Sequence, residues 1–311
     1  MHYPFTYDEC HPPVTPDHHQ HQQQHSTHSI PKRLGMQGNL SYLMTYDNTE
    51  QCKIQFVSES VTDLIGFQPD EIIGQPAYAF FDPNEVTALR QVHLSNVMNE
   101  KLCSMISYRY RHKNGSFVKL QTVYHYCCDN LVTISWIYDS DSLGHKQRMN
   151  SVDEAFEITD KGELQLTSMG SFPWRPNDLK ESMKHSLMVS RRWHKERIQH
   201  EQEPRFHVIL NRYSERMTIV YVSSMVSNLL GILPGDILGK SIFDVVHYLD
   251  RPVVEAQCLS AKSHYVTARI RFDWMVDMDR DVRQPVDTVV SGSTDGLVMV
   301  VRLTRNPVQL C

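Results

Sequence analysis

Residues 54–74 read IQFVSESVTDLIGFQPDEIIG, and residues 219–239 read IVYVSSMVSNLLGILPGDILG. From 54 to 219 the offset is 165 residues, and the alignment needs no gap. Every Gly and Pro of the first stretch is repeated, as Gly66 with Gly231, Pro69 with Pro234 and Gly74 with Gly239. Because each of these residue types fixes a local backbone geometry, their identical placement indicates a duplicated unit.

The ends of the two units correspond as well. Residues 129–132 (DNLV) and 295–298 (DGLV) each begin an apolar run, at an offset of 166 residues. Periodicity and turn residues predict the order strand, two short helices, long helix and three strands. In the first unit these elements are expected at 54–57, 58–66, 69–74, 86–97, 102–112, 117–126 and 131–138. In the second unit the three strands are expected at 264–275, 285–291 and 297–304.

The duplication divides the chain into a tail at 1–35, a domain at 36–145, a linker at 146–203 and a domain at 204–306. Each domain is expected to fold as a separate unit. The tail is too poor in apolar residues to repay the entropy of folding, and we interpret it as disordered. It carries His11, His18, His19, His21, His25 and His28. Such a tract could bind a metal, but compositional bias alone is the preferred interpretation.

Within the linker, a connector helix is predicted at 178–203. Asp178 and Glu181 resemble a capping box, and Pro204 provides the stop. Such a helix would either bind a partner or dock on the second sheet. DNA binding through its cations is less favoured, because glutamates at 196, 201 and 203 balance Arg191, Arg192, Lys195 and Arg197.

Composition excludes several classes of protein. With 41% hydrophobic and 22% charged residues in a chain of 311, the sequence has enough apolar material for ordinary cores. No apolar run is long enough for a membrane span or a signal peptide, so we expect a protein of the nucleus or cytoplasm. The formal net charge of -5 provides no global attraction for nucleic acid. Seven cysteines without a CxxC pair indicate reduced thiols and exclude a zinc finger.

The element order, with the wording FVSESVTDLIGFQPDEIIGQ at 56–75 and YVSSMVSNLLGILPGDILGK at 221–240, resembles the PAS domain family. The resemblance covers residues of about 38–142 and 204–305. It implies an α+β fold class: two PAS folds, each a five-stranded antiparallel sheet with short helices on one face and a small interior cavity. PAS domains are sensing and dimerisation modules. Tandem pairs of this length resemble regulators of the fungal white-collar type and of the animal helix-loop-helix PAS type.

The chain departs from the light-sensing members of that family. Their cysteine motif, whose thiol forms the flavin adduct, is replaced by FFDPNE at 80–85 and by VVHYLD at 245–250. A thiol adduct is therefore not expected, although a noncovalent ligand in a PAS cavity, flavin or haem, stays an alternative. A haem would need His93 or His247 as its ligand. We interpret both as surface or capping histidines, because a lone His without a partnered geometry is seldom a ligand. No cofactor is predicted, and no cofactor-binding residue is assigned.

No catalytic residues are predicted. The sequence has no phosphate-binding GxxxxGK[ST] loop, no kinase signature and no GxSxG elbow. Asp277, Asp279 and Asp281 resemble the start of a calcium loop. The Gly and Glu that such a loop requires are replaced by Val282 and Thr288, so we interpret the segment as a solvated loop and predict no metal site. Helix-loop-helix, GATA-type and homeodomain signatures are absent as well.

The last three strands of the first unit carry large apolar side chains in both alternating sets. The two sets together contain Ile106, Tyr108, Tyr110, Val123, Tyr124, Tyr126, Ile134, Trp136 and Tyr138. Only one set can face the domain's own core, so the other predicts a partner surface unless the connector helix covers it. We therefore expect a non-enzymatic signalling or transcription-regulatory protein that binds another PAS protein or itself. The alternative is a small-molecule or light receptor.

Overall fold

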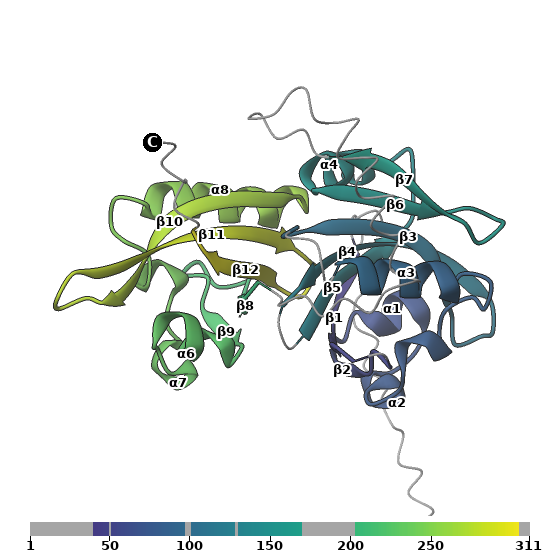
Figure 1. Cartoon of the computed structure of the whole chain (residues 1–311), viewed down its shortest axis with the longest axis horizontal. Coiled ribbons are helices and arrows are strands. Elements are labelled where there is room, and N and C mark those ends of the chain that lie inside the picture. The colour runs from purple at the N-terminus through teal and green to yellow at the C-terminus, as the bar shows by residue number, and fades with distance from the viewer. Residues whose placement is uncertain (1–39, 50, 97–100, 128–129, 170–202, 305–311) are drawn as a thin grey trace, which may run out of the picture. The chain divides into compact units, whose positions relative to one another are not determined.

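The first PAS-like unit is built on a sheet of seven strands. The computed structural model describes residues 40–49, 51–96, 101–127, 130–169 and 203–304. The strands of this sheet are ordered β2-β1-β5-β4-β3-β6-β7 (Figure 1). They are β1 (Ser41–Asp47), β2 (Ile54–Val57), β3 (Ser104–Arg111), β4 (Phe117–Tyr126), β5 (Asn130–Ile137), β6 (Glu154–Ile158) and β7 (Leu164–Met169).

Short helices link β2 to β3 and build the core of this unit against the sheet. They are α1 (Val61–Ile65), α2 (Pro69–Ile72), the 3-10 turn η1 (Ala77–Ala79) and α3 (Val86–Asn96). Gly66 ends α1 in the left-handed region at φ 78°. Most residues with a Cβ pay a steric cost there, which explains the repeated glycine. Val61, Leu64 and Ile65 point inward and are buried with Tyr108 and Tyr110 of β3.

The second unit repeats the plan with a five-stranded sheet, ordered β10-β11-β12-β8-β9. Its strands are β8 (Phe206–Leu210), β9 (Ile219–Val222), β10 (Thr267–Asp277), β11 (Val282–Gly292) and β12 (Leu297–Leu303). Its helical elements are α6 (Met225–Leu230), α7 (Pro234–Ile237), η2 (Ile242–Asp244) and α8 (Arg251–His264). Gly231 ends α6 at φ 69°, as its counterpart ends α1. The long helix α8 packs against β10 and β11 (Figure 1).

The predicted fold class is confirmed, but the expected five strands are wrong for the first unit. After β5 the chain forms α4 (Leu143–Ser151), and β6 then pairs parallel to β3, with Ser104 opposite Glu154. Residues 146–169, which the sequence assigned to the linker, thus complete the first sheet. The sequence signal for these strands was weak because both are short and β6 contains two glutamates. A parallel strand also needs a crossover, and α4 supplies it.

Two further predictions fall on segments outside the described residues. The His-rich tail at 1–35 is one of them, and residues 178–202 of the connector helix are the other. Glu203, the last residue of the predicted helix, is described and lies in a non-helical segment before β8. Each domain was expected to fold as a separate unit, and this stays a prediction. No described helix has the length and apolar character that crossing a membrane requires.

Candidate functional site

The outer faces of the two sheets share one apolar cluster. Period-two alternation points one set of side chains in each sheet toward its own helices and the other set away from them. The side chains that point away from the helices are buried together in one cluster. Tyr265, the residue that follows α8, also belongs to this cluster. The first sheet supplies Leu43, Met105, Val123, Val132, Ile134 and Trp136, and the second supplies Ile209, Val289, Val298 and Val300. The predicted partner surface of the first unit is therefore covered by the second sheet.

Two residues of that predicted surface have different roles. Trp136 lies on the outer face, where the Arg148 guanidinium of α4 stacks 4.3 Å from its ring centroid. Burial lowers the pKa of Arg148 to about 10, and Gln121 Oε1 accepts hydrogen bonds from its Nε and Nη2 at 3.1 and 2.9 Å. Tyr124, by contrast, points into the core of the first unit. Of the two alternating sets, Tyr124 therefore belongs to the one that faces the domain's own core.

A chain of polar groups crosses the middle of the interface. His125 on β4 contacts Ser291 Oγ on β11, with 3.1 Å between Nε2 and the hydroxyl oxygen. Ser291 Oγ lies 3.0 Å from Thr267 Oγ1, which in turn lies 3.6 Å from Cys103 Sγ. On its other side, His125 Nδ1 lies 3.0 Å from the Leu102 carbonyl oxygen. All of these side chains are buried, so their protons must be distributed among themselves.

The Leu102 carbonyl fixes the tautomer of the neutral His125, and with it the direction of the bonds that follow. A carbonyl oxygen only accepts, so His125 carries its proton on Nδ1 and presents a lone pair at Nε2. Ser291 then donates to Nε2, Thr267 donates to Ser291, and the Cys103 thiol donates to Thr267. Protonation of Nε2 would turn it into a donor to Ser291 Oγ, and the hydroxyl protons of Ser291 and Thr267 would then have to turn toward Cys103. The direction of the chain therefore follows the charge of the imidazole.

The electrostatics of the interface agree with a neutral His125. Burial lowers the pKa of His125 from 6.5 to about 4, and the nearby Arg205 and Arg269 act in the same direction. The hydrogen bond to the Leu102 backbone opposes the shift, and Asp153 opposes it more weakly. His207 of β8 is buried, and its ring lies 5.2 Å from that of Tyr221. Burial also lowers the pKa of His207 to about 4, with a further contribution from His125.

We expect acid to destabilise the protein between pH 6.5 and 4 through His125. The unfolded chain has the higher pKa, so it binds more protons in this window. The stabilisation is complete above pH 6.5 and is lost as the pH falls toward 4, by on the order of 3 kcal/mol. Urea titrations at several pH values should show this loss, and His125→Gln should reduce its slope. An unchanged slope in the variant would contradict the assignment.

Ion pairs surround the polar chain. The Asp153 carboxylate accepts hydrogen bonds from the backbone N–H groups of Leu102 and Cys103 at 3.0 and 3.1 Å. Its other oxygen lies 2.7 Å from Arg269 Nη2 on β10. The Asp153 side chain is 2% exposed and that of Arg269 is 37% exposed. One carboxylate of the first unit therefore holds its own strand end and a cation of the second unit.

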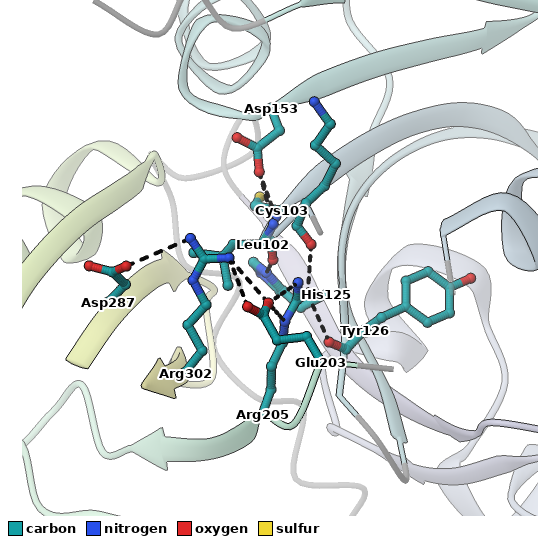
Figure 2. A network of polar contacts seen from close by, with 10 residues as sticks. Leu102, Cys103, His125, Tyr126, Asp153, Glu203, Arg205, Asp287 and Arg302 are labelled. Atoms are coloured by element: carbon teal, nitrogen blue, oxygen red, sulfur yellow. Dashed lines mark hydrogen bonds and ion pairs between the residues drawn. The ribbon is translucent and has the colours of Figure 1, made fainter. Parts of the chain in front are cut away.

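A second group of charges lies at the start of β8 (Figure 2). Arg205 donates to the backbone carbonyls of Lys101 and Tyr126 at 2.6 and 3.3 Å. Glu203 accepts from Arg205 at 2.8 Å and from Arg302 at 3.1 Å, and Figure 2 shows its carboxylate between the two guanidinium groups. The hydrogen bonds and cations lower the pKa of Glu203 against the opposing effect of burial. This group fixes β8 to the strand ends of the first unit.

The first unit also has a partly open cavity of about 60 Å³ between its helices and its sheet. Its walls are Tyr46, Cys52, Tyr78, Phe81, Leu89, Val92, His93, Tyr108, Tyr124, Tyr126, Leu131 and Thr133. His93 Nδ1 lies 2.8 Å from the Tyr126 hydroxyl, and burial lowers the His93 pKa. Burial raises the pKa of Tyr108 and that of Cys52 to about 12, so both groups are neutral at physiological pH.

The structure changes the interpretation of the two histidines considered as haem ligands. Both were interpreted as surface or capping residues, but His93 is buried in the cavity wall and His247 is 4% exposed. The His247 amide donates to the Asp273 carbonyl at 3.0 Å, and its ring lies 4.4 Å from that of Tyr248. The two histidines belong to different units and share no cavity among those found.

The acidic residues noted in the sequence have local partners. Asp277 caps a turn by accepting from the amides of Asp279 and Arg280 at 3.0 and 3.1 Å, and Asp281 pairs with Arg283 at 2.8 Å. Asp279 and Asp281 are exposed, as expected for a solvated loop. Glu85, from the segment that replaces the flavin-binding motif, binds Arg109 at 2.8 Å. Within the described residues, no cluster of His, Cys, Asp and Glu is suited to hold a metal.

Sequence reasoning did not find the polar chain across the interface. His125, Ser291, Cys103 and Thr267 are single polar or thiol residues within apolar strands. The one feature of the sequence that relates them is the repeat, because at an offset of 166 residues Ser291 is the equivalent of His125.

Comparison with known proteins agrees with the geometry. A model described as "PAS domain" matches residues 39–144, and one described as "PAS fold" matches residues 196–309. Protein cycle of Drosophila melanogaster is 28% identical over 96 residues, which are 30% of this chain and 23% of the fly protein. Basic helix-loop-helix ARNT-like protein 2 of Mus musculus is 27% identical over 70 residues, 22% of this chain and 12% of the mouse protein. The matches thus span less than a quarter of these relatives.

Two solved structures are similar to parts of the chain. The Drosophila melanogaster Cycle PAS-B with bound ethylene glycol has a TM-score of 0.29 and 24% identity, covering 31% of this chain and 99% of that one. The Stigmatella aurantiaca phytochrome photosensory core module has a TM-score of 0.29 and 16% identity, covering 34% of this chain and 20% of that one.

Proposed function

Because this chain belongs to the PAS family and carries two PAS domains in tandem, we propose that it is a signalling and transcription-regulatory protein that acts by binding proteins. Its matches to Protein cycle and to a basic helix-loop-helix ARNT-like protein support a regulatory role. The observation that carries the proposal is the burial of one PAS sheet by another PAS sheet. The outer face of a PAS sheet in this chain is thus a protein-binding surface by its chemistry.

The proposed partner is another PAS protein or a second copy of this chain, and the proposed mode of action is recruitment in the nucleus or cytoplasm. We propose no catalysis. The buried Asp153 carboxylate and the His125 imidazole both bind backbone groups.

A tethering assay tests this function. The full chain is fused to an unrelated DNA-binding domain beside a reporter gene, and the proposal expects reporter expression to change several-fold. Two differently tagged copies of the chain, and a tagged copy with the Cycle PAS-B domain, are tested in parallel for association by light scattering. An inert reporter together with no association in either mixture would contradict a role in recruitment.

The cavity of the first unit supports a second candidate, a receptor for a small noncovalent ligand. Its volume of about 60 Å³ corresponds to roughly two water molecules at about 30 Å³ each. Sites for drug-sized ligands occupy about 300–1,000 Å³, so a flavin or haem would require the walls to move apart. The Tyr126 hydroxyl also binds His93 Nδ1, which engages one nitrogen of the candidate haem ligand.

A visible absorption spectrum of the purified full chain separates the two candidates. The regulatory proposal expects no band from a flavin or a haem. A stoichiometric chromophore would favour the receptor. For a colourless ligand, ethylene glycol provides a probe of the right size. Saturable binding that Val92→Phe abolishes by filling the cavity would support a receptor function.

A further inference from the structure

The interface brings equivalent residues of the two units into contact. The isolated bridges between Phe81 and Tyr110 and between Val246 and Trp274 align Tyr110 with Trp274. The same alignment of β3 with β10 makes Thr267 the equivalent of Cys103. Aligning the DNLV and DGLV segments makes Ser291 the equivalent of His125. Both pairs are contacts: 3.6 Å separates Cys103 Sγ from Thr267 Oγ1, and 3.1 Å separates His125 Nε2 from Ser291 Oγ.

Residues that meet their own equivalents lie on a two-fold axis. In an isologous interface the same patch is used on both sides. The apolar members follow this rule as well. Val123, Val132 and Ile134 share the cluster with Val289, Val298 and Val300, their equivalents at an offset of 166.

A contact away from the axis has a counterpart made by different residues. Ser41 begins β1, and it exchanges hydrogen bonds with Thr294 in the β11–β12 turn at 2.9 and 2.8 Å. Ser41 lies opposite Trp136, and Arg205 comes one residue before Phe206, which lies opposite Val301 on β12. Arg205 is therefore the counterpart of Ser41. Arg205 reaches the end of β4 in the first unit, at the Tyr126 carbonyl. Each domain thus anchors its first strand on the turn region of the other.

We propose that the two PAS domains are each other's dimerisation partner, forming an isologous sheet-to-sheet pair closed within one chain. The occupant of the first domain's outer face is the second domain, whose hydroxyls at 267 and 291 complete the polar chain. This inference goes beyond the proposed function, because it holds whether or not an outside partner exists. An outside PAS sheet has to displace the second domain to reach this face.

The first test is a disulfide between equivalent positions in the full chain. In Thr267→Cys the new thiol replaces a hydroxyl that lies 3.6 Å from Cys103 Sγ. Mild oxidation should join Cys103 to the new thiol within one chain, as shown by peptide mass spectrometry of the monomer. Adding Cys103→Ser to the variant removes the native thiol and should abolish this bond. A bond found only between two chains, or no bond between these positions, would overturn the proposal.

The second test cuts the chain between the domains. A site-specific protease site is inserted after residue 186 of the full chain and is cleaved to completion. The two fragments should co-elute with the mass of the uncut chain, because the interface and not the connection holds them together. Separate elution of two folded fragments would overturn the proposal while leaving the reporter assay for the proposed function unaffected.

Discussion

Leu64→Asp is expected to unfold the first PAS domain at temperatures where the unmodified chain is stable. Leu64 is 5% exposed and lies in the core cluster with Val61 and Ile65 of α1. An aspartate there has to bury an unpaired carboxylate or keep it protonated, and losses above about 4 kcal/mol are expected from such changes. Because about 1 kcal/mol moves a domain of this size by roughly 4–8 °C, the melting temperature should fall by more than about 15 °C.

The repeat provides a comparison for this variant. Leu229, the equivalent residue of α6, is only partly buried, whereas the neighbouring Leu230 is 7% exposed. Leu229→Asp should therefore destabilise its domain clearly less than Leu64→Asp does. Asp63→Asn, at an exposed position of α1, is the control for a change of charge. Circular dichroism melts that place Leu64→Asp within about two degrees of Asp63→Asn would show that the core is assigned wrongly.

Asp153→Ala is expected to have the largest effect on the interface. It removes the acceptor for two backbone N–H groups and the partner of Arg269. Breaking a buried ion pair from one side costs about 3–5 kcal/mol, and the half-exposed position of Arg269 places the expectation at the lower end. Urea unfolding should show this loss. Asp153→Asn keeps an acceptor for the amides and should lose less.

Asp141→Ala removes an exposed carboxylate from the segment just before α4 and is the matched control. It should leave the free energy of unfolding within about 0.5 kcal/mol of the unmodified chain. Equal stability of Asp153→Ala and Asp141→Ala would mean that the ion pair and its two amide bonds contribute nothing to the fold.

The strongest sequence signals were those in which one residue fixes one backbone geometry. Gly66 and Gly231 end their helices at positive φ, as the repeat predicts. The turn at Asn114-Gly115 correctly separated β3 from β4. The strand β6 was missed because it pairs with β3, which lies about fifty residues earlier in the chain. The strand β7 pairs with β6, so it was missed together with β6.

The candidate site was less predictable for a related reason. Alternation showed that the first sheet has a second apolar face, and this inference is confirmed by the burial of Val123, Ile134 and Trp136. What covers that face depends on long-range packing, so the second sheet could not be anticipated. His93 was interpreted as a surface or capping residue because the sequence shows no second residue that would hold it in place. Its partner, the Tyr126 hydroxyl, lies 33 residues away along the chain and meets it only in the folded core.

Thiol alkylation of the native full chain tests the central claim, the pairing of the two sheets, most directly. Cys52 and Cys258 are buried inside the two domains, whereas Cys103 and Cys127 are buried in the shared cluster. With the sheets paired, all four thiols should react with iodoacetamide far more slowly than in urea, as followed by peptide mass spectrometry. Rapid labelling of Cys103 and Cys127 while Cys52 and Cys258 stay protected would show two folded domains whose sheets do not meet, and would contradict the account.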